Sequence, residues 1–142
     1  MWWRHDKPEK LEAALSDNYN VILCPRIPLY FDFDQSESHE FGRKWRGAFS
    51  SLELVYAFPP DTLPGFTEHE NLVKGIQANI WTERIHDNKR FDFMTHPRLS
   101  ALAESGWTKK ENKNLDDFNR RLKPMLTWFD KLDIYYYNPF QP

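Results

Sequence analysis

The stretch Asn20-Val21-Ile22-Leu23-Cys24-Pro25 decides the fold. It is short, apolar and rich in β-branched residues, and a proline closes it, which is typical of a strand buried on both faces of a parallel sheet. Upstream, Pro8 stands where the first turn of a helix tolerates proline, and apolar residues then recur at helical spacing. The pattern predicts a helix over residues 8–16. A helix that leads into a buried strand is half of a βαβ unit.

Downstream of this strand the sequence predicts a long loop, a second strand and two helices. Residues 25–64 are too rich in aromatic side chains for a disordered segment, so we expect an ordered loop that forms a site. Residues 72–81 are predicted to form the second strand. Helices are predicted from Pro97 and from about Leu115, and Pro124 is expected to kink or split the last one. This order predicts an α/β fold with parallel strands and a site at their C-terminal ends.

Length and charge limit the classes of protein to which the chain can belong. Its 142 residues suffice for one domain with a core, or for a piece of one. The 19 basic and 21 acidic residues are mixed along the sequence, so we expect no nucleic-acid partner. No apolar run reaches the roughly 18 residues of a membrane span, and the first residues lack the features of a signal peptide, which leaves the compartment unknown.

Aromatic residues are the unusual part of the composition. They make up 16% of the chain, including six tryptophans, although the mean hydropathy is −0.76. Rings in a polar sequence suit a sugar-binding surface, because pyranose faces stack on indoles while sugar hydroxyls need polar partners. A core rich in aromatic side chains explains the same composition. Composition alone leaves both interpretations open.

Three groups of residues are candidates for a site, of which two follow the predicted strands and one stands near the start of the chain. In a parallel barrel the functional residues lie at the C-terminal ends of the strands. These groups are Trp2-Trp3, Tyr30 with Asp32, and Trp81 with Glu83. By residue type, Asp32 and Glu83 suggest a glycosidase in which one acid protonates the leaving oxygen and the other attacks or activates water. A solvated loop acid at position 32 and an ordinary ion pair of Glu83 with Arg84 or Arg4 explain them equally well. The rings likewise fit core packing.

Other common sites are not predicted. The histidines are scattered over loops without the short spacings that converge on zinc, so no metal site is expected. No glycine-rich phosphate loop and no G-x-S-x-G elbow occurs, which argues against nucleotide binding and serine hydrolase chemistry. Cys24, the single cysteine, excludes an internal disulfide and is expected to be a buried small side chain. No cofactor is implied.

Five short stretches occur in one order along the chain. They are residues 25–33 with Tyr30-Phe31-Asp32, Lys44-Trp45-Arg46-Gly47, Leu54-Val55-Tyr56-Ala57-Phe58, residues 75–83 ending in Trp81-Thr82-Glu83, and His96-Pro97-Arg98-Leu99-Ser100-Ala101-Leu102-Ala103-Glu104. Together they resemble the end of the catalytic domain of the family 20 glycoside hydrolases, the β-N-acetylhexosaminidases. The resemblance implies that residues 1–142 are the C-terminal portion of a (β/α)8 barrel, a partial TIM barrel with its last strands and closing helices.

A full barrel takes about 250 residues, so the resemblance also implies an incomplete domain. A partial barrel leaves strand edges uncovered, and we therefore expect self-association or pairing with the missing half of the barrel. The parent family is often secreted, periplasmic or lysosomal, and the chain itself does not decide among these.

The resemblance assigns a terminal N-acetylhexosamine, GlcNAc or GalNAc, as the ligand. Tyr30 resembles the tyrosine whose hydroxyl holds the acetamide of the substrate against the anomeric carbon. Asp32 and Glu83 resemble the carboxylates that accept hydrogen bonds from the outer hydroxyls of the sugar, a role that replaces the catalytic pair considered above. The indoles that enclose the N-acetyl group and the floor of the sugar are matched by Trp3, Trp45 and Trp81.

The chemistry that the resemblance implies is substrate-assisted and retaining. The acetamido oxygen of the substrate is the nucleophile and gives an oxazolinium intermediate. In the family an adjacent Asp-Glu pair polarises the acetamide and protonates the leaving oxygen, but this chain has no Asp-Glu dipeptide, and the first-strand arginine of the family is also absent. We therefore expect the chain alone to lack the general acid and to be inactive. The alternatives are a non-catalytic sugar-binding or structural remnant, and an unrelated α/β domain with an aromatic core.

Overall fold

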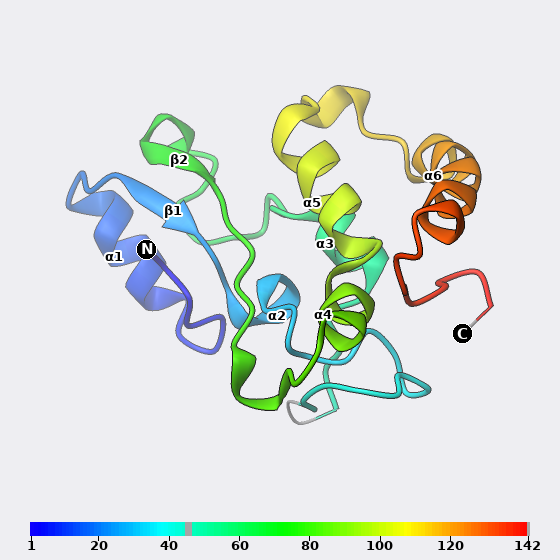
Figure 1. The fold of residues 1–142 in the computed structure, drawn as a ribbon. Coiled ribbons are helices and arrows are strands. Elements are labelled where there is room, and N and C mark those ends of the chain that lie inside the picture. The colour runs from blue at the N-terminus through cyan, green and yellow to red at the C-terminus, as the bar shows by residue number, and fades with distance from the viewer. Residues whose placement is uncertain (45–46, 142) are drawn as a thin grey trace.

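Figure 1 presents the fold of the chain in a computed structural model, which describes residues 1–44 and 47–141. The helices and strands, in chain order, are α1 (Glu9–Ser16), β1 (Val21–Leu23), α2 (Arg26–Leu29), α3 (Leu52–Ala57), β2 (Val73–Ile76), α4 (Asn88–Thr95), α5 (Arg98–Trp107) and α6 (Leu115–Lys131). Single 3-10 turns occur at Glu70–Leu72, Thr82–Arg84 and Lys110–Asn112. The predictions of helices at residues 8–16, from Pro97 and from Leu115 are confirmed. Within the described residues, every helix is too short or too polar to cross a membrane.

The sheet consists of β1 and β2, which pair in parallel as predicted. Leu23 of β1 lies opposite Ile76 of β2, and its other side forms a parallel bridge with Trp2 near the start of the chain. The second strand is shorter than the predicted 72–81. β1 ends at Leu23, so after the hydrogen bond from the Gln77 N–H to Leu23 O the regular pairing stops, and Asn79 then forms an isolated bridge with Tyr30.

The expectation that β1 is buried on both faces is wrong. Val21 and Leu23 are buried, whereas Ile22 between them is 37% exposed. Leu11 and Leu15 of α1 join the same apolar core as Val21 and Leu23. A strand points alternate side chains to opposite faces, so α1 covers one face of β1 and the face that carries Ile22 stays open.

The larger part of the core lies among α3, α5 and α6, on the other side of the molecule from α1 (Figure 1). The ring of Tyr56 on α3 stacks on Phe118 of α6 at a centroid distance of 4.8 Å. The ammonium of Lys113 donates to Phe58 O and to Ser105 Oγ, both at 2.9 Å, and so ties the ends of α3 and α5 to the start of α6. These contacts hold the three helices together behind the long loop.

Two features of the helical part differ from the sequence prediction. α6 is not split at Pro124 but runs from Leu115 to Lys131, because the flanking turns place Leu122 and Leu126 in the same core. α4 was not predicted, because its first residues, Asn88-Lys89-Arg90, are polar. Its start carries a signal nonetheless: the Asp87 carboxylate accepts from the N–H of Arg90 at 2.7 Å, a common N-cap.

Candidate functional site

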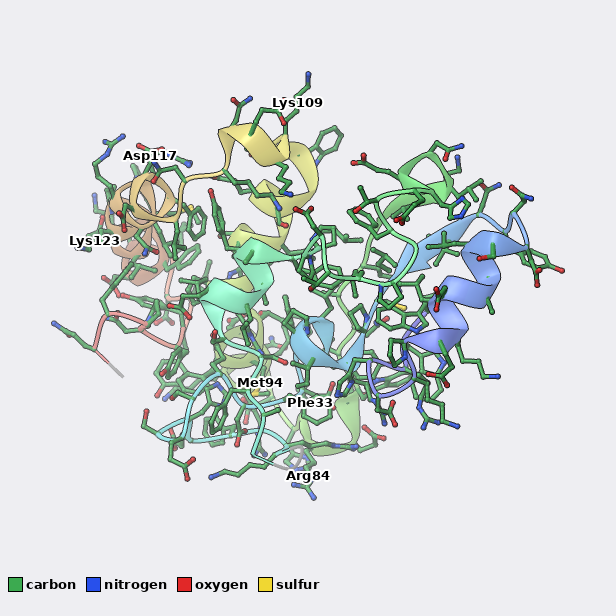
Figure 2. All side chains as sticks on the ribbon, turned by 180° about the vertical axis from the view of Figure 1, so that it is seen from behind. Phe33, Arg84, Met94, Lys109, Asp117 and Lys123 are labelled. Carbon is green, nitrogen blue, oxygen red and sulfur yellow. The ribbon has the colours of Figure 1, made fainter. Side chains whose placement is uncertain are left out.

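A hollow of about 970 Å³ lies beside the segments that follow β1 and β2. It is lined by Met1, Trp3, Cys24, Arg26, Tyr30, Asp32, Phe33, Arg43, Lys44, Asn79, Trp81, Glu83 and Arg84. Figure 2 labels two of these residues, Phe33 and Arg84, which lie at the opposite end of the molecule from Lys109 on the turn after α5. The hollow thus belongs to the end of the fold that the long loop forms.

The residues that the resemblance assigned to the sugar and that the structure describes line this one hollow, namely Trp3, Tyr30, Asp32, Trp81 and Glu83, whereas Trp2 is buried in the core. Trp45 lies outside the described residues. The five side chains come from three segments that are far apart in the sequence. An unrelated domain with an aromatic core gives no reason for such convergence, since its rings would be buried separately.

Backbone pairing sets the positions of Tyr30 and Trp81. Tyr30 forms a parallel bridge with Asn79. The N–H of Phe31 donates to Asn79 O at 2.7 Å, and the N–H of Asn79 donates to Leu29 O at 2.8 Å. Trp81 follows two residues later, so its ring lies 6.0 Å from that of Tyr30 at an angle of 58°. Burial raises the pKa of Tyr30, which keeps its hydroxyl protonated and able to donate a hydrogen bond.

Asp32 is a buried carboxylate whose oxygens lack hydrogen-bond donors. The residue is 5% exposed, and neither oxygen accepts a hydrogen bond of ordinary geometry from the described residues. Burial raises the pKa of Asp32, while backbone N–H groups and the nearby Arg43 act in the opposite direction. Buried acceptors without donors are costly to a protein, so two such oxygens on the wall of a hollow indicate a ligand that brings donors.

Arg43 connects this acid to Glu83. Its Nε lies 3.6 Å from Asp32 Oδ2, and its Nη2 lies 3.0 Å from Glu83 Oε2. The side chain of Glu83 is 63% exposed, so one acid of the pair is covered and the other faces solvent. The sequence analysis missed Arg43, because nothing near it in the sequence indicates a partner, and it instead considered Arg84 or Arg4 as the ion-pair partner of Glu83.

Trp3 presents its indole at the edge of the hollow between two cations. The guanidinium groups of Arg4 and Arg26 lie 5.3 and 5.2 Å from its ring centroid, and both arginines pair with Asp6. Such cation–π contacts hold an indole without burying it. Trp3 is 43% exposed, so its ring is oriented and still accessible.

Arg98 does not line the hollow but holds the backbone on both sides of Asp32. The sequence analysis quoted it only as part of a motif. It is fully buried, and its guanidinium donates to the carbonyl oxygens of Phe31 at 2.7 Å and of Phe33 at 3.0 Å. It also donates to Ser50 O at 3.0 Å and to Met94 O. Burial lowers the pKa of Arg98 to about 9, which still leaves it charged at neutral pH. The two carbonyls flanking Asp32 are therefore held by one rigid group.

Neither a metal nor a reactive thiol is indicated at this hollow. Within residues 1–44 and 47–141, no group of three or more His, Cys, Asp or Glu side chains is arranged to hold a metal ion. Cys24 is buried as predicted, and its thiol donates to Trp2 O at 3.3 Å. Burial raises the pKa of Cys24, so the sulfur stays in the unreactive thiol form.

Comparisons with known proteins identify the family of the chain. Residues 1–110 match the model of the family described as glycosyl hydrolase family 20, catalytic domain. The chain is 34% identical over 128 residues to a beta-hexosaminidase of Porphyromonas gingivalis, across 89% of this chain and 16% of that protein. It is 29% identical over 131 residues to a beta-N-acetylhexosaminidase of Cellulomonas fimi, across 92% of this chain and 26% of that protein.

Solved structures give the same result. A family 20 exo-β-N-acetylglucosaminidase from Vibrio harveyi, solved in complex with N-acetylglucosamine, superposes with a TM-score of 0.82 at 30% identity, over 98% of this chain and 22% of that one. A family 20 β-N-acetylhexosaminidase from Streptomyces coelicolor A3(2) superposes with a TM-score of 0.86 at 27% identity, over 97% and 28%. The chain spans from 16% to 28% of the length of these four relatives.

Proposed function

Because this chain belongs to glycosyl hydrolase family 20, we propose that its hollow is the pocket for the terminal N-acetylhexosamine of a glycan. The observation that carries the proposal is the convergence of Trp3, Tyr30, Asp32, Trp81 and Glu83 on that hollow. A volume of about 970 Å³ accommodates a monosaccharide with room for its leaving group. The proposed ligand class is GlcNAc or GalNAc at a non-reducing end.

Each of these five residues has a role in this proposal. The protonated hydroxyl of Tyr30 holds the acetamide, and that bond turns the acetamide oxygen toward the anomeric carbon. The exposed indole faces of Trp3 and Trp81 cover the N-acetyl group and the floor of the ring, together with Trp45. Asp32 and Glu83 accept from the outer hydroxyls, and the missing hydrogen bonds of Asp32 support this assignment, because a sugar supplies the donors that it lacks.

The proposed reaction of the parent domain is hydrolysis with retention through an oxazolinium intermediate. In it this chain supplies binding and orientation. Tyr30 aims the nucleophilic acetamide, the indoles exclude water from one face of the sugar, and the two acids fix the ring by its hydroxyls. The chain has no Asp-Glu dipeptide to polarise the acetamide and protonate the leaving oxygen. We therefore propose that the chain alone is inactive.

The same proposal extends to the fold. The parallel order Trp2, β1, β2 fits three neighbouring strands of a barrel, of which residues 1–142 form the C-terminal portion. Val21 and Leu23 pack with α1 as strands pack on the outer helices of a barrel, and the open face of Ile22 then looks to the interior. Such a portion pairs with the missing half of a barrel or with a second copy, because its outer strand edges are unpaired.

Isothermal titration with a GlcNAc-thiazoline inhibitor tests the pocket, with the intact chain complemented by the remaining barrel segment of a relative. Replacing Tyr30→Phe together with Glu83→Gln removes one donor and one charged acceptor, so binding weakens by roughly a hundredfold. The matched control is Tyr19→Phe, since Tyr19 is exposed and lies outside the hollow. Inhibitor affinity that survives the double substitution would refute the assignment.

A non-catalytic sugar-binding or structural role is the second candidate, and the absence of an Asp-Glu pair favours it. Both candidates leave the isolated chain inactive, so they differ in the activity of the chain complemented by the remaining barrel segment, which hydrolyses an aryl N-acetylglucosaminide only under the first. Hydrolysis of an aryl N-acetylglucosaminide by this chain alone would eliminate the non-catalytic role, and it would also overturn the proposal that the isolated chain is inactive.

A further inference from the structure

The side chain of Arg43 lies between two acids that come from different segments. Asp32 belongs to the long loop after β1, and Glu83 belongs to the 3-10 turn Thr82–Arg84 that follows β2. Asp32 is almost fully covered, so its position is fixed by packing, whereas Glu83 is largely exposed and has many rotamers open to it. The contact of 3.0 Å to Arg43 ties the exposed acid to the covered one.

The backbone of Arg43 is itself fastened to the segment that carries Asp32. The N–H of Arg43 donates to Asp32 O at 2.8 Å, and the N–H of Asp34 donates to Arg43 O at 3.0 Å. Gly42, just before it, has a φ of +127°, and any Cβ there would collide with the Asp34 carboxylate. Main-chain hydrogen bonds therefore fix the backbone of Arg43 next to Asp32, and the Arg43 side chain extends from that fixed position.

Three of the neighbouring cations have other partners, while Arg84 lines the hollow next to Glu83. Lys44 pairs with Glu37 at 3.3 Å, Arg26 pairs with Asp6, and Arg98 points at carbonyl oxygens beneath the loop. Among the described residues, Arg43 alone makes ion pairs with both Asp32 and Glu83. A planar guanidinium can contact two carboxylates at once from opposite sides, which a compact ammonium does less well.

We propose that Arg43 is a positioning residue of the sugar pocket, whose guanidinium holds the carboxylates of Asp32 and Glu83 at the spacing that two hydroxyls of one sugar ring require. The inference rests on the proposed function and adds a residue to it. Without Arg43, the side chain of Glu83 turns toward solvent. Sugar binding must then order that side chain, and the loss of its conformational entropy weakens the affinity.

The charge of Arg43 also acts on Asp32 itself. Burial raises the pKa of Asp32, Arg43 opposes the rise, and Glu83 adds to it. The backbone N–H of Trp81, the hydroxyl of Tyr30 and the guanidinium of Arg98 also interact with this carboxyl, and Lys44 and Arg84 line the same hollow. Removal of the Arg43 charge takes away an interaction that lowers the pKa of Asp32, so that pKa should rise further.

The test uses the full chain, N-acetylglucosamine as the probe, and NMR titrations of both the sugar and pH. Arg43→Gln should bind the sugar roughly tenfold more weakly and raise the pKa of Asp32, followed through its carboxyl carbon. Arg43→Lys should restore part of the affinity, because it keeps the charge without the fork. Arg120→Gln is the control, since the side chain of Arg120 is 73% exposed on α6 and does not line the hollow.

The outcomes separate the inference from the proposed function. Affinity that is unchanged or tighter in Arg43→Gln overturns the inference, because Arg43 would then be idle or in competition with the sugar. A wild-type chain that binds no N-acetylglucosamine overturns the proposed pocket instead. In that case the pH titration alone tests the effect of Arg43 on Asp32. An Asp32 pKa that is unchanged in Arg43→Gln would then refute the inference.

Discussion

Asp32 combines a proposed role in binding with a cost to the fold. Its carboxylate is buried and accepts no hydrogen bond of ordinary geometry from the described residues, and burial raises its pKa in the folded chain above the value of the unfolded chain. Between these two values the folded chain binds more protons than the unfolded one, so stability falls as the pH rises through that window. The charge that suits a sugar hydroxyl therefore destabilises the empty pocket at neutral pH.

Asp32→Asn should accordingly raise the free energy of unfolding near neutral pH while it removes the charged acceptor. The gain should disappear below the ordinary carboxyl pKa of about 4, where Asp32 is protonated in both states. Urea unfolding at a series of pH values measures this. Glu37→Gln is the control, because the side chain of Glu37 in the same loop is 84% exposed and its loss should change stability by less than about 0.5 kcal/mol. A less stable Asp32→Asn at neutral pH would contradict the account.

Among single residues, the sequence predicted those lining residues of the hollow that lie next to strands. Tyr30 and Trp81 stand at the ends of predicted strands, which parallel pairing brings to one edge, and the resemblance to the family assigned them to the sugar pocket. Arg43 and Arg98 were missed as site residues. Arg43 pairs with Glu83 of another segment, and Arg98 donates to carbonyls about 65 positions away. No local sequence pattern encodes such contacts.

Between elements, Arg98 joins α5 to the loop that carries the site. Its side chain supplies donors to carbonyls from the loop after β1, from the segment before α3 and from the end of α4. Its guanidinium also lies 4.6 Å from the ring of Phe31. A cation with this many carbonyl partners fixes the path of the backbone on both sides of Asp32, so the geometry of the pocket depends on a helix that does not line it.

Arg98→Met should lower the free energy of unfolding by roughly 3 kcal/mol or more, because it leaves several buried carbonyls without donors. Urea unfolding followed by circular dichroism measures the change. Arg120→Met is the control, since the side chain of Arg120 is 73% exposed and its ion pair with Asp117 should contribute little. Equal stabilities of the two variants would show that Arg98 does not hold the loop.

The elements themselves were predictable where the periodicity is long. α1, α5 and α6 were predicted, since each carries an apolar stripe over two turns or more. β2 was overestimated, because its length is set by where β1 ends rather than by its own apolar run. Pro124 did not split α6, since packing of Leu122 and Leu126 in the core outweighs the lost backbone hydrogen bond.

For the whole molecule, the central claim is that one hollow, built from the start of the chain, the loop after β1 and the segment after β2, binds a single sugar. Family membership and the order of the motifs agree with this claim, and the positions of the rings make it measurable. Trp3 and Trp81 line the hollow, whereas Trp107 and Trp128 are exposed on the helices α5 and α6. Trp107 and Trp128 therefore serve as internal controls for sugar binding at the hollow.

The most direct measurement is an NMR titration of the chain with N-acetylglucosamine in which the indole N–H signals of these tryptophans are followed. The account predicts that the signals of Trp3 and Trp81 shift and saturate together, while those of Trp107 and Trp128 stay in place. Glucose, which lacks the acetamide, should cause smaller shifts at the same concentration. Shifts of equal size at all four indoles, or at none of them, would contradict the account.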